Sequence, residues 1–387
     1  MRGVGDVLMT GVLPGSPPVP RAGLRLRRSG PCRHRCSEYI NYFPYWQVVS
    51  RRFLPAPPYD DDVTAPHTPV LLDCDTGIDD AIALTYLEAR DDVEIVGIVS
   101  TAGNVGTEQV LANNLALSAM LGIEAPVARG AAAPLVQELM TAEDTHGPTG
   151  LGHAILPQPA GSPRTADPRS GAQLWVDAAR AHPGELVGLV IGPHTNLALA
   201  LEIEPELPSL LRRLHIMGGA INHRGNTLPT TEWNIAVDPD AARRVLAAFT
   251  AAPQRPVLAP LDATEAVRFT QETVDRLRAI SAHPVITVLV DALRWYFEFH
   301  EADGFGWMAH VHDPLVVAHA LEPGLARTSP LAVDVELEGT LTRGQTVGDW
   351  LGRWGLDPNV DLMVEADADT FVDHLLRVLE RRFGATY

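Results

Sequence analysis

Short apolar runs alternate with segments of helical periodicity from Pro69 to the end of the chain. The apolar or alternating runs predict strands, at residues 69–73, 93–100, 125–130, 186–192, 213–219 and 331–339. The segments in which apolar residues recur every three or four positions predict helices, at 79–89, 107–121, 172–182, 194–203, 239–249, 284–300, 314–321 and 369–383. This order predicts an α/β, Rossmann-like fold: an open, mostly parallel, mixed sheet with helices on both faces.

Residues 1–67 have a different character. They carry nine arginines against five acidic residues, a net charge of +4, whereas residues 68–387 carry 21 arginines against 43 acidic residues, a net charge of −22. The proline- and glycine-rich N-terminal stretch has no apolar period, so residues 1–67 are predicted to be a disordered extension and 68–387 a single domain. A second hypothesis is a wrongly assigned start, with translation beginning near Val63.

Composition narrows the class of protein. A hydrophobic content of 46% with 20% charged residues is typical of a globular protein, and no apolar stretch approaches the roughly 20 residues of a membrane span. The net charge of −18 argues against a nucleic-acid partner, because a phosphate backbone needs a basic face. Three cysteines are too few for a disulfide framework, which favours a cytoplasmic location.

Four aspartates crowd the turn after the first predicted strand, in "DCDTGIDD" at 73–80. Ligands of parallel sheets bind beyond the carboxyl ends of the strands, where this turn lies. So many carboxylates in one space require a cation or protons, and ligands that are all oxygens favour Ca²⁺ or Mg²⁺. Haloacid-dehalogenase-like phosphohydrolases share the Asp-x-Asp, with Asp73 as the nucleophile, but do not need the pair Asp79 and Asp80.

The chain resembles the inosine–uridine preferring nucleoside hydrolase family from about Pro69 onward. "DCDTGIDD" matches every fixed position of the Asp-x-Asp-x-Gly-x-Asp-Asp signature of that family. Six further segments are similar to family motifs in the same order: "VSTAGNVG", the flap "PLVQELMTAEDTHGPTGLG", "IGPHTNLA", "HIMGGA", "GNTLPTTEWNIAVDP" and "VHDP". Six motifs over about 250 residues make the resemblance strong. It implies the nucleoside hydrolase version of the Rossmann-like fold.

The resemblance also implies a Ca²⁺ site. Its ligands would be Asp75, Asp80, Asp313 and the main-chain carbonyl of Ile191. The ion would also bind the ribose 2′- and 3′-hydroxyls and one water, from which Asp75 takes a proton as general base. The plain alternative for Asp75 and Asp80 is helix capping. Capping accounts for one of them and not for the whole acidic group.

Substrate contacts follow from the same resemblance. Asp79 and Asn234 would bind the ribose hydroxyls, Asn104 would lie near the attacking water, and Asn226 and Glu232 would bind the 5′-hydroxyl. Loop asparagines also make turns, and that alternative stays open for each of them taken singly. His312 is the candidate acid for the departing base.

On the side of the base, His146 on the flap and His300 would contact the nucleobase. His310 is interpreted as an ordinary surface or packing residue. Trp233 and Trp307 are candidates for stacking on a base or for packing.

The predicted activity is Ca²⁺-dependent hydrolysis of ribonucleosides to ribose and nucleobase, with no nucleic-acid or membrane partner. A homodimer or homotetramer is expected from the family. The alternatives are an Mg²⁺-dependent phosphohydrolase, against which the absence of any lysine argues, and a nucleoside-binding protein without catalysis.

Overall fold

The computed structural model describes residues 67–156 and 164–384. A nine-stranded sheet forms its centre, in the order β10-β13-β7-β6-β5-β1-β2-β3-β4. Neighbouring strands are parallel except β10, which pairs antiparallel with β13 at one edge. The nine strands are β1 (Thr68–Cys74), β2 (Val93–Ser100), β3 (Val127–Arg129), β4 (Asp167–Ser170), β5 (Val187–Val190), β6 (Arg213–Met217), β7 (Val257–Ala259), β10 (Ala326–Leu331) and β13 (Val360–Ala366).

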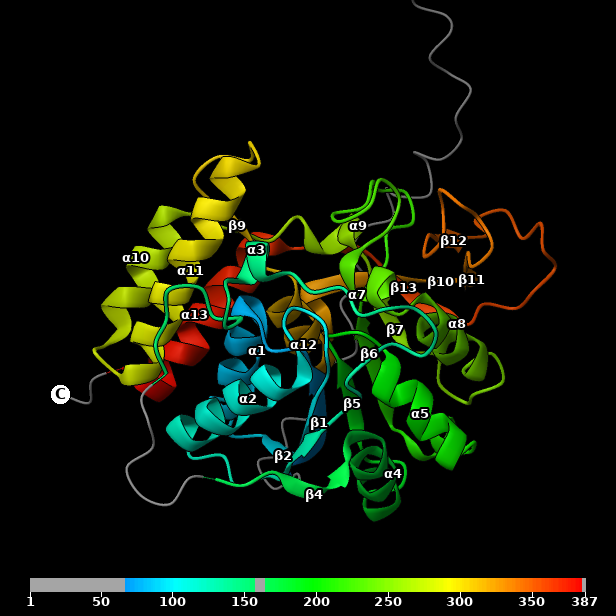
Figure 1. Cartoon of the computed structure of the whole chain (residues 1–387), viewed down its shortest axis with the longest axis horizontal. Helices are drawn as coiled ribbons and strands as arrows, with labels where there is room; N and C mark the ends of the chain where they lie inside the picture. The colour runs from blue at the N-terminus through cyan, green and yellow to red at the C-terminus, as the bar shows by residue number, and fades with distance from the viewer. Residues whose placement is uncertain (1–66, 157–163, 385–387) are drawn as a thin grey trace, which may run out of the picture. The chain divides into compact units, whose positions relative to one another are not determined.

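Helices cover both faces of the sheet (Figure 1), and each face buries its own apolar core. One core belongs to α1 (Ile78–Glu88), α2 (Thr107–Leu121), α10 (Gln271–Ile280), α11 (Pro284–Ala302), α12 (Asp313–Leu321) and α13 (Ala368–Phe383). The other belongs to α4 (Gly171–Ala181), α5 (Thr195–Ile203) and α8 (Pro239–Ala248). The predicted mixed α/β fold with helices on both faces is therefore confirmed.

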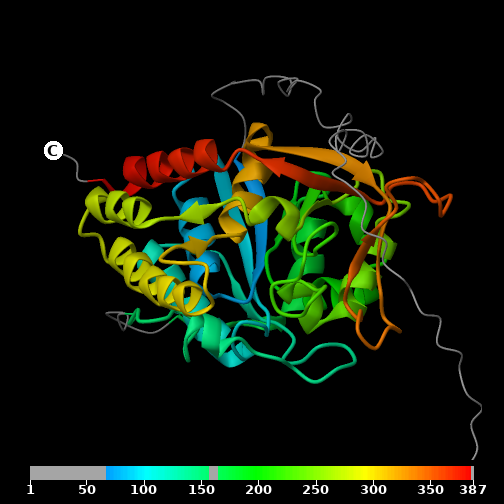
Figure 2. The ribbon, with the colours of Figure 1, turned by 90° about the horizontal axis from the view of Figure 1, so that it is seen from above.

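Short elements complete the described chain. They are α3 (Glu143–His146), α6 (Leu207–Leu210), α7 (Trp233–Val237), α9 (Leu261–Thr264) and the 3₁₀ helix Pro323–Leu325, with two small antiparallel pairs, β8 (Arg268–Phe269) with β9 (Ala309–His310) and β11 (Val333–Val335) with β12 (Thr346–Gly348). The view from above shows the β11–β12 segment beside the green helices (Figure 2), where β11 packs on α8.

Most predicted elements agree with the structure, and β2 and α2 have the predicted bounds. The strand predicted at 331–339 is wrong in extent. Leu331 ends β10 and pairs with β13 in the main sheet, Val333–Val335 pairs with β12 outside it, and residues 336–339 form no strand. Within the described residues, no helix combines the length and apolar character needed to span a bilayer. The predicted N-terminal extension lies outside the described residues, apart from His67.

Candidate active site

One cavity of about 390 Å³ opens at the carboxyl edge of the sheet, beyond the adjacent parallel strands β6, β5, β1 and β2. Of the residues predicted for the site, eleven line this cavity: Asp75, Asp79, Asn104, His146, Ile191, Asn226, Glu232, Asn234, His300, His312 and Asp313. Asp80 is buried beside it and hydrogen-bonded by the side chain of Asn104, one of the lining residues. The structure thus brings together segments that are up to 238 residues apart in sequence, from Asp75 to Asp313.

Two helix N-termini supply the carboxylates at the floor of the cavity. Asp79 and Asp80 lie in the first turn of α1, and Asp313 begins α12, which packs against α1. Carboxylate oxygens of these three residues lie within 4.8 Å of one another, and all three side chains are buried. The positive ends of both helix dipoles partly offset the negative charge.

The electrostatics of this group call for a cation. Burial raises the pKa of Asp75 to about 7 and that of Asp79 to about 6. Burial and then repulsion from neighbouring aspartates raise the pKa of Asp80 and of Asp313 well above the ordinary range. Oδ1 of Asp80 is buried without a hydrogen-bond partner in the described part of the chain. A divalent ion would give that oxygen a partner and compensate the charges, so the donor set fits Ca²⁺ or Mg²⁺.

Glycines allow the loops to close around Asp75. Its Oδ2 accepts a hydrogen bond of 2.8 Å from the backbone N–H of Asn104. A Cβ on Gly103 would lie 2.2 Å from Asp75 Oδ2, and a Cβ on Gly192 would lie 2.9 Å from Oδ1. Any larger residue at either position would displace the Asp75 carboxylate. Among the described residues, Asp79, Asp80 and Asp313 form the group whose carboxylate oxygens lie close enough together to share an ion, and Asp75 is not part of that group. The resemblance implies that Asp75, and not Asp79, is a ligand together with Asp80 and Asp313. This ligand set stays a prediction.

Three of the predicted ribose-binding residues, Asn226, Glu232 and Asn234, lie in the loop before α7 or in α7 itself. Glu232 caps α7, with Oε1 accepting from the Asn234 N–H at 2.8 Å and Oε2 accepting from Gly219 N–H at 2.9 Å. Burial raises the pKa of Glu232 to about 7. The Asn234 amide donates to the Ile191 carbonyl at 3.0 Å, and Asn226 Oδ1 accepts from the Trp233 N–H at 2.9 Å. These bonds hold the side chains in fixed orientations at the cavity wall.

His146 and His312 are each oriented by a hydrogen bond. Nδ1 of His146 accepts from the backbone N–H of Ile78 at 3.2 Å, so the neutral ring carries its hydrogen on Nε2. Nδ1 of His312 pairs with Oγ1 of Thr264 at 2.9 Å, and its backbone N–H donates to Asp79 Oδ2 at 3.2 Å. Burial, followed by neighbouring histidines, lowers the pKa of both imidazoles to about 3. Both rings are therefore neutral near pH 7.

His300 has both ring nitrogens committed to backbone. Its Nδ1 donates to the Tyr296 carbonyl at 2.8 Å, which leaves Nε2 to accept from the His310 N–H at 3.3 Å. A base could therefore meet this ring only through its carbon atoms. His310, interpreted from the sequence as a packing residue, lines the cavity. Its spacing of two from His312 was an available signal, because residues i and i+2 of an extended segment share a face.

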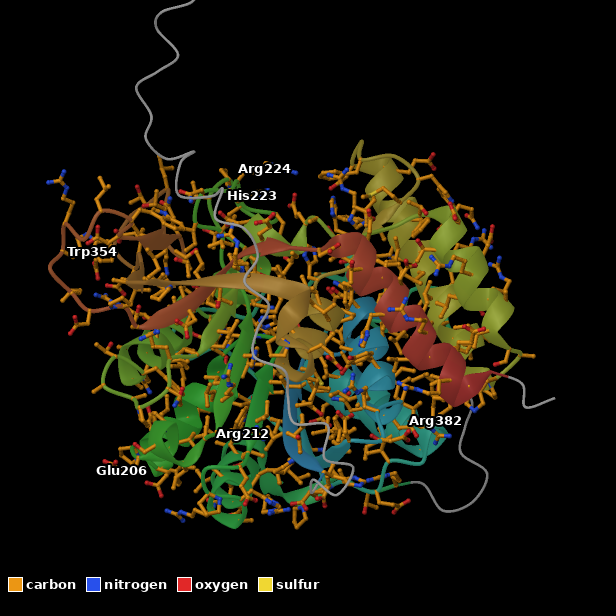
Figure 3. The ribbon with its side chains drawn as sticks, turned by 180° about the vertical axis from the view of Figure 1, so that it is seen from behind. Glu206, Arg212, His223, Arg224, Trp354 and Arg382 are labelled. Carbon is orange, nitrogen blue, oxygen red and sulfur yellow. The ribbon has the colours of Figure 1, made fainter. Side chains whose placement is uncertain are left out.

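The mouth of the cavity carries residues that the sequence interpretation missed. Arg224 lies 5.3 Å from the centroid of the Phe305 ring and 3.9 Å from the Glu265 carboxylate. His223 and Arg224 are neighbours on the loop after β6 (Figure 3).

The two tryptophans named from the sequence as candidates for stacking differ in position. Trp233 lines the cavity, whereas Trp307 is not among the lining residues and donates to Gln271 at 2.9 Å.

Comparisons with known proteins agree on one family. The profile of the inosine-uridine preferring nucleoside hydrolases matches residues 70–373. The pyrimidine-specific ribonucleoside hydrolase RihA of Escherichia coli O9:H4 (strain HS) is 38% identical over 309 residues, which cover 79% of this chain and 96% of that protein. Among solved structures, a purine-preferring ribonucleoside hydrolase from Gardnerella vaginalis is 30% identical, with a TM-score of 0.74 over 81% of this chain and 98% of its own. The plant nucleoside hydrolase PpNRh1 is 27% identical, with a TM-score of 0.74 over 83% of this chain and 100% of its own.

Proposed function

The chain belongs to the inosine-uridine preferring nucleoside hydrolase family and is a nucleoside hydrolase, and from that premise we propose that it cleaves pyrimidine ribonucleosides with Ca²⁺ in its acidic cluster. The preference for pyrimidines is supported by the 38% identity to relatives named pyrimidine-specific, which exceeds the 30% identity to the purine-preferring structure. The proposed products are free ribose and the nucleobase.

The observation that carries the metal proposal is the buried acidic cluster. Asp79, Asp80 and Asp313 converge within 4.8 Å, and Oδ1 of Asp80 has no partner in the described chain. Carboxylate and carbonyl oxygens in a loop-built pocket favour Ca²⁺ over the strictly octahedral Mg²⁺. When bound, the ion supplies charge that binds vicinal hydroxyls and lowers the pKa of water. We propose Asp75, Asp80, Asp313 and the carbonyl of Ile191 as its ligands, with Asp79 close enough to join them.

Asp75 is the proposed general base. Its carboxylate lines the cavity, is held at Oδ2 by the Asn104 N–H, and has a pKa raised by burial to about 7. A carboxylate that accepts one backbone hydrogen bond keeps a second oxygen with which to take a proton from the attacking water. The amide of Asn104 is next to this position and would orient the water.

The sugar is proposed to bind between the carboxyl edge of the sheet and the loop before α7. Asp79 and Asn234 would bind the 2′- and 3′-hydroxyls, while Asn226 and Glu232 would bind the 5′-hydroxyl. Each of these side chains is already fixed by a backbone hydrogen bond. Preorganised polar groups discriminate strongly against a substrate that lacks their partner, so 2′-deoxynucleosides should be poor substrates.

Two histidines face the departing base. We propose that His312 assists the leaving base. With Thr264 Oγ1 donating to its Nδ1, the neutral ring keeps a hydrogen on Nε2 and donates a hydrogen bond to the base, whereas full proton transfer requires the imidazolium form, which the lowered pKa makes scarce near pH 7. The backbone N–H of Ile78 fixes the Nε2–H tautomer of His146, so this ring would donate a second hydrogen bond to the base. His300 would contact the base through its ring face. Together these groups would stabilise the negative charge that develops on the base.

The phosphohydrolase alternative does not fit this geometry. Asp73, which would have to be the nucleophile, is fully buried and is not among the residues that line the cavity. Its Oδ2 accepts from the Trp175 indole at 2.7 Å, and its Oδ1 accepts from the Asn196 amide at 3.0 Å. A carboxylate so enclosed has no access to a phosphate ester.

A reducing-sugar assay across nucleosides tests the proposal. Uridine and cytidine should release ribose faster than inosine and adenosine, and 2′-deoxyuridine should be turned over poorly. Asp75→Ala should lose several orders of magnitude in kcat, because both the general base and a metal ligand are removed. Asp373→Ala, on exposed helix surface, is the matched control and should behave as wild type.

Three outcomes would contradict the proposal. Asp75→Ala activity within about tenfold of wild type would remove Asp75 from the chemistry. Nucleoside binding by the wild type without ribose release would favour the binding-protein alternative. Inosine turned over faster than uridine would contradict the pyrimidine preference.

A further inference from the structure

His310 is a buried histidine that no step of the proposed mechanism uses. It ends β9, its side chain is only 5% exposed, and it lines the cavity. Its Nδ1 is buried and has no hydrogen-bond partner among the described residues. His194, His215 and His319 also have buried ring nitrogens without partners, but these three rings do not line the cavity. His310 therefore differs from them in being next to the space that a substrate would enter.

The surroundings of His310 hold its ring in place. Its backbone N–H donates to His300 Nε2 at 3.3 Å, and β9 pairs with β8 through Arg268. The ring of Phe305 meets that of His310 edge-on at 5.6 Å, and the ring of His312 stacks with it at 6.1 Å. Aromatic neighbours offer no donor to Nδ1, so nothing in the wall competes with a ligand for this atom.

Nδ1 of a neutral imidazole is an acceptor when the hydrogen is on Nε2. Burial, followed by repulsion from His300, Arg268 and Arg224, lowers the pKa of His310 to about 4, while the backbone of Glu265 acts in the opposite direction. The imidazole is therefore neutral near pH 7 and has one hydrogen. With that hydrogen on Nε2, Nδ1 keeps its lone pair.

An unpaired acceptor in a cavity wall is costly to the free protein unless a ligand pairs with it. Pyrimidine and purine bases carry N–H groups on the edge that lies away from the glycosidic bond. The rings of His312 and His310 lie side by side, so a base whose departing nitrogen faces His312 would bring another part of its ring toward His310. An N–H at that part of the base would supply the missing donor.

We propose that His310 is a specificity-determining residue, whose Nδ1 accepts a hydrogen bond from an N–H of the nucleobase. The proposal rests on the proposed function and assigns one further contact within the same site. In this proposal a ring nitrogen of His310 binds the edge of the base. His300 cannot do this, because both of its ring nitrogens are hydrogen-bonded to backbone groups.

The test compares three substrates and two variants. Uridine has a free N3–H, 3-methyluridine has a methyl group in its place, and p-nitrophenyl β-D-ribofuranoside has a leaving group without any N–H. His310→Phe keeps an aromatic ring and removes the acceptor. His310→Asn places an amide oxygen near the position of Nδ1. His153→Phe, an exposed histidine paired with Glu298, is the matched control.

Wild type should prefer uridine over 3-methyluridine by at least about tenfold in kcat/KM, the value of one hydrogen bond. His310→Phe should lower kcat/KM for uridine by about 10- to 100-fold and bring the ratio of the two nucleosides close to one. Its activity on the nitrophenyl riboside should change by less than about threefold, because that leaving group never used the acceptor. His310→Asn should retain most of the preference for uridine, and His153→Phe all of it.

Several results would overturn the inference. Equal losses on uridine and on the nitrophenyl riboside would show that His310 supports the fold or the chemistry. An unchanged uridine rate in His310→Phe would show that the ring makes no contact with the base. If His310→Phe fails to fold, a wild-type ratio of uridine to 3-methyluridine near one overturns the proposal by itself. Failure of the proposed function has a different signature, because wild type would then release ribose from none of the three substrates.

Discussion

Asp73 and Asp75 lie two residues apart but have different environments. The carboxylate of Asp73 accepts hydrogen bonds from the side chains of Trp175, Asn196 and Thr101, and it ties β1 to α4 and α5. Asp75, just beyond the end of β1, faces the cavity. We propose that Asp73 supports the edge of the sheet next to Asp75 and takes no direct part in the chemistry.

Replacing Trp175 with phenylalanine should show whether Asp73 stabilises the fold or takes part in the reaction. The substitution leaves Asp73 Oδ2 without its donor in a fully buried site, so the free energy of unfolding should fall by about 1–3 kcal/mol. The kcat on uridine should stay within about threefold. Trp295→Phe is the matched control, because the indole nitrogen of Trp295 has no partner in the described chain. Urea unfolding measures the difference, and equal stability of the two variants would contradict this role of Asp73.

Thr264 positions His312 in this account. Thr264→Val keeps the shape and removes the hydroxyl that pairs with His312 Nδ1, so kcat should fall by about tenfold with little change in KM. Thr264→Ser should restore most of the rate. Steady-state kinetics on uridine measures this, and a valine variant as fast as wild type would show that the orientation of His312 does not depend on Thr264.

At the scale of elements, the site depends on two helix N-termini that meet. α1 contributes Asp79 and Asp80, α12 contributes Asp313, and both helices belong to the same core. Carboxylates in the first turn of a helix are favoured by its dipole, but here burial outweighs that effect and raises the pKa values. The cluster is thus stable when it is either protonated or bound to a cation.

The raised pKa values of the aspartates predict how the free energy of unfolding depends on pH. In the ion-free protein the pKa values of Asp75 and Asp79 lie at about 7 and about 6, above the ordinary value of 3.8. A raised pKa in the folded state means that the stability contributed by these groups is present at low pH and lost as pH rises through about 6 to 7. The rise in melting temperature produced by Ca²⁺ should therefore be larger at pH 8 than at pH 5, where the ion must displace protons.

The difference between melting temperatures with and without Ca²⁺ is the right readout. His146 and His312 have lowered pKa values of about 3, so their contribution is lost in the opposite direction, as pH falls below about 6.5. These histidines affect the ion-free and ion-bound proteins alike, so the difference largely cancels them. Asp313→Asn is expected to abolish the Ca²⁺ effect. A Ca²⁺ effect of equal size at both pH values would contradict the coupling.

The sequence predicted the elements whose signal is local. β2 and α2 were predicted with their observed bounds, because the pattern that indicates each one lies within its own eight or fifteen residues. β7 has only three residues, and β10 contains Pro330, so neither has a clear period. β13 pairs with β7 across about 100 residues of sequence, and no local pattern announces such a pairing.

The same limit applies to the site. Asp75 and Asn104 could be predicted to converge, because their loops follow the neighbouring parallel strands β1 and β2. Asp313 follows β9, which lies outside the main sheet. The hydrogen bond from His312 to Thr264, and the commitment of both His300 nitrogens, depend on side-chain geometry that only the folded chain defines. His310 is buried among aromatic rings, as a packing residue would be, and the structure adds that it also lines the cavity.

At the scale of the whole molecule, all described elements lie between Thr68 and Phe383, and the family profile spans 70–373. We propose that residues 68–387 belong to one catalytic domain. A variant that begins at Val63 should keep kcat/KM on uridine within about twofold of the full chain and unfold at the same temperature. A large loss of activity in the shortened chain would assign a catalytic or structural role to residues 1–62.

Light scattering on both chains would test the expected homodimer or homotetramer.

The most direct test of the central claim is ribose release from uridine by protein stripped with a strong chelator, while Ca²⁺ is titrated back. With the metal content verified as negligible, this account predicts less than about 1% of the full rate, since both substrate binding and water activation need the ion. The rate should rise along a saturating curve as Ca²⁺ is added, and it should reach its maximum when one ion is bound per chain. A stripped protein that hydrolyses uridine at the full rate would contradict the account.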